Sequence, residues 1–146
     1  MRVLFACDHA GLELKKMLIQ RAEERGCEVE DLGVHGSDTA DYPDFAHLVA
    51  ERIAGNEATR GVLVCGTGIG MAMAANRHVG VRAALCHDAF TAEMARRHND
   101  ANVLCLGGRV TGAGVALNIL DIFLSTPFDG GRHAPRVAKI EKRSSP

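Results

Sequence analysis

Short apolar runs alternate with segments of helical periodicity along the whole chain, and this alternation restricts the fold most. Five runs are typical of β-strands, and helical patterns separate them. The runs are mostly apolar throughout, with residues 28–32 the weakest, and this is typical of parallel strands covered by helices on both sides. The sequence therefore predicts an α/β fold, a Rossmann-like doubly wound sheet of five parallel strands. The predicted strands are residues 2–7, 28–32, 61–65, 79–86 and 103–106.

The apolar spacing also predicts the helices and the connections. At 146 residues the chain fits one domain, residues 1–146, and residues 33–44 are expected to form a polar loop. Residues 130–146 are expected to form a helical tail. The inner faces expected for the first and last long helices are Leu14, Met17, Leu18 and Ala22, and Val115, Ala116, Ile119, Leu120, Phe123 and Leu124.

Two loops are the first candidates for a functional site. In doubly wound sheets, ligands bind beyond the carboxyl ends of the strands, where the winding reverses. Asp8-His9 follows the first strand and Cys65 to Gly70 follows the third. These two strands are neighbours in a flavodoxin-like order, so we expect the two loops to lie side by side.

The segment from Cys65 to Gly70 carries the strongest local signal. Its alternating glycines leave the peptide N–H groups uncovered, and a helix is expected to begin there. Such a loop binds a phosphate or an oxyanion, although it can also be only a tight turn. A thiol at this position, with an ordinary pKa of about 8.5, would become more acidic. Cys65 is thus either a base or, like most reduced cysteines, a small buried apolar residue.

The other candidates each have a structural and a functional interpretation. Asp8 is either a helix cap or a carboxylate in the crevice, and His98 either favours a helix C-terminus or acts on a ligand. Arg132 and Arg136 lie four residues apart and would share a helix face, where they could bind one phosphate. Arg109, after the fifth strand, is a possible third donor.

Composition and spacing argue against several other functions. The net charge of −1 gives no basic field for nucleic acid or an anionic membrane, and the absence of a signal-peptide pattern predicts a cytoplasmic protein. The glycine loop departs from a dinucleotide-binding pattern at Met71, although Asp88 has the spacing of a ribose-binding carboxylate. No pair of cysteines has a structural-zinc spacing.

Taken in order, five motifs resemble the type B ribose-5-phosphate isomerases, within the family that includes galactose- and allose-6-phosphate isomerases. The resemblance implies a Rossmann-like fold, a homodimer or dimer of dimers, a sugar phosphate substrate, and no metal or organic cofactor. The motifs are CDHAG (Cys7 to Gly11), DYPDFA (Asp41 to Ala46), CGTGIGMAMAANR (Cys65 to Arg77), RHNDANVLCLGGR (Arg97 to Arg109) and GGRHAPRV (Gly130 to Val137).

The resemblance also implies a role for each candidate residue. Cys65 would be the base that moves a proton between C2 and C1, and Asp8 would relay a proton between O1 and O2. His98 would open the furanose ring. His9 and Asn99 would bind the sugar. The tail, residues 130–146, would pack on the partner subunit, and its arginines, assisted by His133, would face that subunit's site. The enediolate would be held by Thr67 and the amides of Gly66, Thr67, Gly68, Ile69 and Gly70, and the phosphate by Arg109, Arg132 and Arg136.

Within this family, one branch has a cysteine base, and another has serine there and a glutamate at the position of Met71. This chain resembles the cysteine branch. The expected reaction is the interconversion of D-ribose 5-phosphate and D-ribulose 5-phosphate through a cis-enediolate. The alternatives are an isomerase of allose or galactose 6-phosphate or of a rare free aldose, a nucleotide-binding module without catalysis, and a catalytically silent regulatory subunit.

Overall fold

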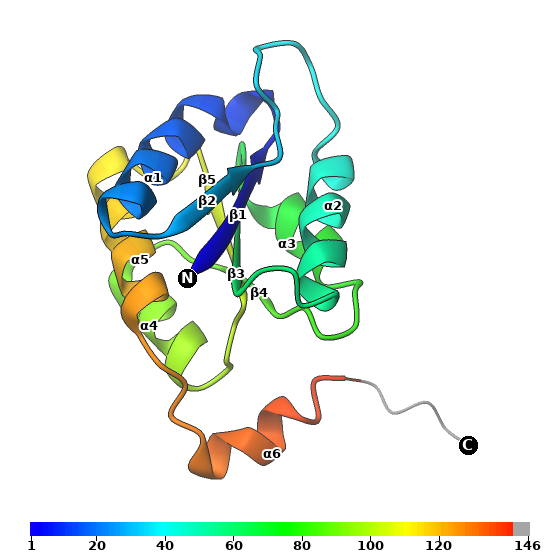
Figure 1. Ribbon diagram of the computed structural model, residues 1–146, viewed down its shortest axis with the longest axis vertical. Coiled ribbons are helices and arrows are strands. Elements are labelled where there is room, and N and C mark those ends of the chain that lie inside the picture. The colour runs from blue at the N-terminus through cyan, green and yellow to red at the C-terminus, as the bar shows by residue number, and fades with distance from the viewer. Residues whose placement is uncertain (142–146) are drawn as a thin grey trace.

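A five-stranded parallel sheet forms the centre of this computed structural model, which describes residues 1–141 (Figure 1). The order across the sheet is β2-β1-β3-β5-β4, and every neighbouring pair is parallel. The predicted α/β fold with five parallel strands in a single domain is confirmed, and so is the expectation that the first and third strands are neighbours. The strands are β1 (Arg2–Cys7), β2 (Glu28–Asp31), β3 (Arg60–Cys65), β4 (Ala83–Leu85) and β5 (Val103–Gly107).

Helices cover both faces of the sheet (Figure 1). Residues of α1 (Leu12–Glu24), α4 (Ala89–Arg97) and α5 (Ala113–Ser125) form one apolar core with the strands. Residues of α2 (Tyr42–Ala54) and α3 (Ile69–Ala75) form the second core, on the opposite face. Because successive strand side chains point to opposite faces, β1, β3, β4 and β5 each contribute to both cores. None of the helices within residues 1–141 is both long and apolar enough to cross a lipid bilayer.

The fourth strand is shorter than the sequence predicted. Only Ala83–Leu85 pairs with β5, whereas residues 79–86 were expected to be extended. Gly80 has a φ of +82°, and the Arg82 N–H donates to the Asn102 side chain at 2.8 Å. The backbone before β4 therefore forms a turn, in which the Arg82 N–H bonds to a side chain.

Two residues expected on inner helix faces lie at their edges instead. Met17 is 44% exposed and Val115 is 48% exposed, while Leu14, Leu18 and Ala22 are buried. One residue step rotates a helix by about 100°, so Met17 is turned away from the direction of Leu18. The polar loop ends slightly early, because α2 begins at Tyr42 with Pro43 in its first turn, where a missing N–H costs nothing.

The tail follows α5 and leaves the body of the molecule. It contains the 3-10 turn η2 (Gly131–His133) and the short helix α6 (Ala134–Val137), which lies apart from the sheet in Figure 1. A similar 3-10 turn, η1 (His9–Gly11), connects β1 to α1. Of the predicted tail, residues 142–146 lie outside the described residues. Whether residues 130–141 pack on a partner subunit stays a prediction.

Candidate active site

The turn after β3 brings a peptide amide against the sulfur of Cys65. The Gly68 N–H donates to Cys65 Sγ at 3.1 Å. Gly68 has a φ of +80°, and a Cβ atom there would lie 2.6 Å from Leu85 Cδ1 and 2.9 Å from the carbonyl carbon of Leu106. Because glycine alone fits both the φ and the space, it is what allows this amide to approach the sulfur.

The rest of the glycine loop also presents polar groups to the cleft. Thr67 Oγ1 accepts a hydrogen bond from the Ile69 N–H at 3.3 Å. The amides of Gly66 and Thr67 bond to no other group within the described part of the chain. These two N–H groups are therefore available to a bound oxyanion.

Cys65 is almost buried, yet it lines a cleft. Its exposed fraction is 5%, and the cleft has a volume of about 410 Å³. Three other cysteines are poor candidates for a base, because burial raises the pKa of Cys7 and of Cys86 to about 11 and that of Cys105 further still. Cys65 thus has both access to the cleft and an N–H donor at its sulfur.

Asp8 lies in the same cleft, after the neighbouring strand β1. Its Oδ1 accepts hydrogen bonds from the N–H groups of Ala10 at 2.9 Å and Gly11 at 3.2 Å. The carboxylate therefore caps the turn η1, and it also lines the cleft with Cys65. Both interpretations of Asp8 apply at once, since the cap fixes the direction of the carboxylate.

His9 and Arg109 do not line this cleft, but each adjoins a residue that does: His9 follows Asp8, and Arg109 bonds to Gly66. The His9 Nδ1 accepts a hydrogen bond from the Ala40 N–H at 3.3 Å, which ties the loop before α2 to the site. The backbone N–H of Arg109 donates to the Gly66 carbonyl at 3.0 Å. Its side chain is exposed and lies beside Gly66. The structure thus brings Arg109 and the loop of Cys65 together.

Two residues of the cleft were not predicted from the sequence. Tyr42, the only tyrosine of the chain, packs so closely on α3 that a Cβ atom at Gly70 would lie 2.5 Å from its ring. Met73 lines the same cleft and is 65% exposed. The DYPDFA motif contains Tyr42, but nothing in the sequence indicates that the start of α2 reaches α3. Met71, at the position of the alternative glutamate, is fully buried in the core.

A second cluster of predicted site residues forms around the end of α4. The rings of His98 and His133 stack with their centroids 4.2 Å apart and an angle of 8° between their planes. Burial and the nearby positive groups lower the pKa of His133, so its imidazole is neutral near pH 7. A cavity of about 250 Å³ is lined by His98, Asn99, His133, Arg136, Val137 and Ile140.

The two clusters lie at opposite edges of the sheet. Cys65 ends β3 at the carboxyl edge, whereas α4 leads the chain from the carboxyl end of β4 back to the amino end of β5. β5 spans five residues, and a strand rises about 3.3 Å per residue. The cavity around His98 shares no lining residue with the cleft of Cys65. A single chain therefore does not bring His98, Asn99 or Arg136 to the sulfur of Cys65.

One group in the second cluster resembles a metal site. Ligand atoms of His98, Asp129 and His133 all lie within 4.8 Å of one another. However, Arg97 Nε already donates to both Asp129 oxygens, at 3.2 and 3.1 Å. Arg132 and Arg136 add positive charge that lowers the pKa of His133. The cluster is therefore better suited to an anion than to a cation.

The profile of the family described as ribose/galactose isomerase matches residues 3–140 of this chain. The chain belongs to this family. The resemblance inferred from the five motifs is thereby confirmed, and the chain is an aldose–ketose isomerase that acts on a sugar phosphate.

Individual members of the ribose/galactose isomerase family are similar over nearly the whole chain. Ribose-5-phosphate isomerase B of Escherichia coli is 44% identical over 139 residues, which are 95% of this chain and 93% of that protein. The structure of ribose-5-phosphate isomerase B from Clostridium thermocellum has a TM-score of 0.94 and 48% identity, and covers 96% of this chain and 95% of its own. A ribose 5-phosphate isomerase structure from Thermotoga maritima has a TM-score of 0.92 and 51% identity, and the match covers 95% of this chain and 96% of that one.

Proposed function

We propose that this isomerase interconverts D-ribose 5-phosphate and D-ribulose 5-phosphate through a cis-enediolate, with Cys65 as the base. The observation that carries the proposal is the 3.1 Å contact between the Gly68 N–H and Cys65 Sγ beside the open cleft. The N–H donor holds the sulfur in place at the cleft, where a bound sugar can reach it. Relatives named as ribose-5-phosphate isomerases support the choice of sugar.

The reaction begins with the opening of the furanose ring, for which His98 is the acid. The thiolate of Cys65 then removes the proton from C2, and the electrons of that C–H bond form the enediolate. The amides of the glycine loop and Thr67 stabilise its oxygens, while Asp8 moves a proton between O1 and O2. Cys65 finally returns its proton to C1, so no proton or electron is lost.

The substrate-binding residues complete the site. His9 and Asn99 bind the sugar, and Arg109, Arg132 and Arg136 bind the phosphate, because a guanidinium matches the geometry of phosphate oxygens. His133, neutral and stacked on His98, holds that imidazole in place.

We also propose that the site is shared between two subunits of a homodimer or of a dimer of dimers. The separation of the two clusters supports this, since His98 and Asn99 lie at the edge opposite Cys65 within one chain. A two-fold axis would place the second cluster of each subunit over the cleft of the other. Each dimer would then hold two equal sites.

Initial rates on a panel of sugar phosphates test the proposed substrate. We expect ribose 5-phosphate to give a higher kcat/KM than allose 6-phosphate or galactose 6-phosphate, with and without a chelator. A preference for either six-carbon sugar would contradict the proposed substrate but keep the proposed mechanism. Tight binding of a nucleotide without isomerase activity would contradict both.

A further inference from the structure

The tail that carries Arg132 and Arg136 is fixed to the body of the molecule at its start. The Asp129 N–H donates to the Arg97 carbonyl at 3.0 Å, and the two side chains form an ion pair. A few residues later, His133 is buried and stacks on His98. These contacts hold the first part of the tail against the end of α4.

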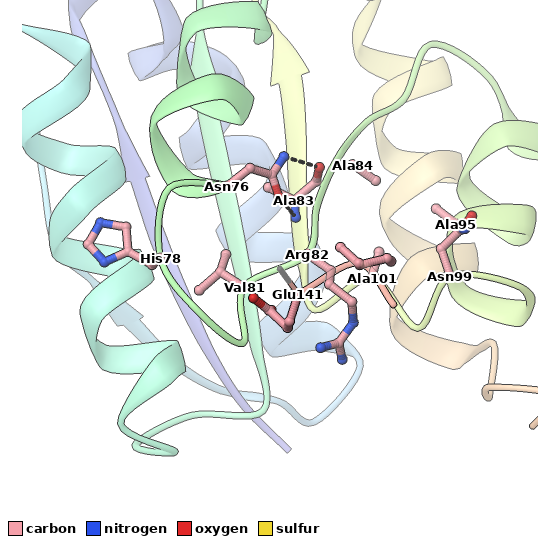
Figure 2. Close-up of a pocket in the computed structure, with 11 residues that line it drawn as sticks. Asn76, His78, Val81, Arg82, Ala83, Ala84, Ala95, Asn99, Ala101 and Glu141 are labelled. Carbon is pink, nitrogen blue, oxygen red and sulfur yellow. Dashed lines mark hydrogen bonds between the residues drawn. The ribbon is translucent and has the colours of Figure 1, made fainter. Parts of the chain in front are cut away.

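The far end of the tail has an attachment of its own. The carboxylate of Glu141 accepts a hydrogen bond from the Gly80 N–H at 2.7 Å, across 61 positions of sequence. Glu141 and Ile140 line a cavity of about 420 Å³ at the amino edge of the sheet. Figure 2 shows Glu141 beside Val81 and Arg82 in this cavity.

The backbone to which Glu141 binds is itself held rigidly. The Gly80 carbonyl accepts a hydrogen bond from Asn102 Nδ2 at 2.8 Å, and Asn102 Oδ1 accepts one from the Arg82 N–H at 2.8 Å. Arg82 in turn forms an ion pair with Asp100 at 2.9 Å. Because Gly80 is fixed through its carbonyl, its N–H offers Glu141 a fixed point in the turn before β4.

The helix α6 lies between these two attachments, and its position depends on them. Among the described residues, the hydrogen bonds that start from residues 134–140 stay within the tail, as from Ala138 to Ala134 and from Lys139 to Arg136. A helix of one turn is not stable on its own, so its position is set by what holds its ends. The position of Arg136 therefore depends on both attachments.

We infer that Glu141 is a positioning residue for the phosphate-binding part of the site. Its hydrogen bond to Gly80 fixes the far end of the tail and so determines where Arg136 stands. The inference rests on the proposed function, in which Arg136 binds the substrate phosphate. Loss of the bond would leave the chemistry at Cys65 unchanged and weaken the binding of substrate.

Steady-state kinetics on ribose 5-phosphate test this inference with a set of matched variants. We expect Glu141→Ala to raise KM about 3- to 10-fold and to change kcat less than about two-fold, since uniform binding is lost and not transition-state stabilisation. Glu141→Gln should restore KM, because its side-chain carbonyl still accepts the Gly80 N–H. Lys139→Ala, at an exposed position of the same tail, should match the wild type.

The double variant Glu141→Ala/Arg136→Ala separates positioning from an independent effect. If Glu141 acts through Arg136, its substitution adds nothing to the KM of Arg136→Ala. The inference alone would be overturned if Glu141→Ala raised KM by the same factor in the wild type and in Arg136→Ala. It would also be overturned if Glu141→Ala kept the wild-type KM while Arg136→Ala raised it. An unchanged KM for Arg136→Ala would instead overturn the proposed phosphate site. Faster amide hydrogen exchange at Gly80 in Glu141→Ala gives a readout independent of activity.

Discussion

At the scale of single residues, Gly68 and Cys65 determine what the cleft can do. The thiol is nearly buried, and the amide of Gly68 donates a hydrogen bond to its sulfur. The sequence predicted uncovered peptide amides and a helix N-terminus next to Cys65, and α3 begins at Ile69. The hydrogen bond comes from Gly68, the residue that precedes the first residue of α3.

Substitution of Gly68 tests this arrangement. We expect Gly68→Ala to lower the free energy of unfolding by about 2 kcal/mol or more, since alanine is strained at positive φ and its Cβ would overlap backbone atoms of Leu106. Activity should fall together with stability, because the amide turns away from Cys65. Thermal denaturation and initial rates measure both effects.

Gly112→Ala is the matched control for that substitution. Gly112 has a φ of −63°, and a Cβ atom there would meet nothing within 4 Å. Its variant should keep the wild-type melting temperature and activity. Equal losses in the two variants would show that Gly68 has no special role.

At the scale of secondary structure elements, ion pairs connect the edge strand β2 to its neighbours. Glu30 accepts hydrogen bonds from Arg52 of α2 at 2.5 and 2.9 Å and from Arg2 of β1 at 2.6 Å. These arginines lower the pKa of Glu30 to about 2. Because the folded pKa lies below the ordinary value of about 4.3, ionised Glu30 stabilises the fold above that pH.

This ion pair predicts a pH-dependent difference in stability. Glu30→Gln should melt at a lower temperature than the wild type at pH 7, and the difference should shrink as the pH falls from about 4 toward 2. Melting curves across this range measure it, with Glu51→Gln at an exposed position of α2 as the control. A difference that stays constant with pH would contradict the proposed cause.

Most helices and strands were predictable from the sequence, because the residues at helical or strand spacing are also the ones that are buried. α5 shows this well, since Ala116, Ile119, Leu120 and Phe123 recur at helical spacing and are all fully buried. β4 was predicted too long, because an apolar run does not reveal that Asn102 binds the backbone of Arg82. Contacts between side chain and backbone that are distant in sequence leave no periodic signal.

At the scale of the whole molecule, the two clusters of site residues lie at opposite edges of one sheet. The sequence indicated most of these residues but not their distribution, because spacing along a chain does not show which edge a residue reaches until the order of strands and helices is known. Tyr42 was missed for the same reason. The tail arginines were expected to face the site of a neighbouring subunit. Because His98 and Asn99 lie in the same cluster, we expect them to face that site too.

Complementation between two inactive variants tests the shared site. Cys65→Ala and His98→Ala should each be inactive alone. If each site combines Cys65 of one subunit with His98 of the other, a mixed dimer holds one intact site. Refolding the variants together in equal amounts should restore about a quarter of the wild-type activity, because about half of the dimers are mixed. No recovery in dimers shown to be mixed would mean that each site lies within one subunit.

The removal of the substrate proton by Cys65 can be measured most directly as isotope exchange. Incubation of ribose 5-phosphate with the enzyme in D₂O, followed by proton NMR, gives the rate at which deuterium enters the carbon that accepts the proton. We predict that Cys65→Ala lowers this rate by about 10³-fold or more, with phosphate binding largely retained. Exchange at close to the wild-type rate in a folded Cys65→Ala variant would show that another group is the base.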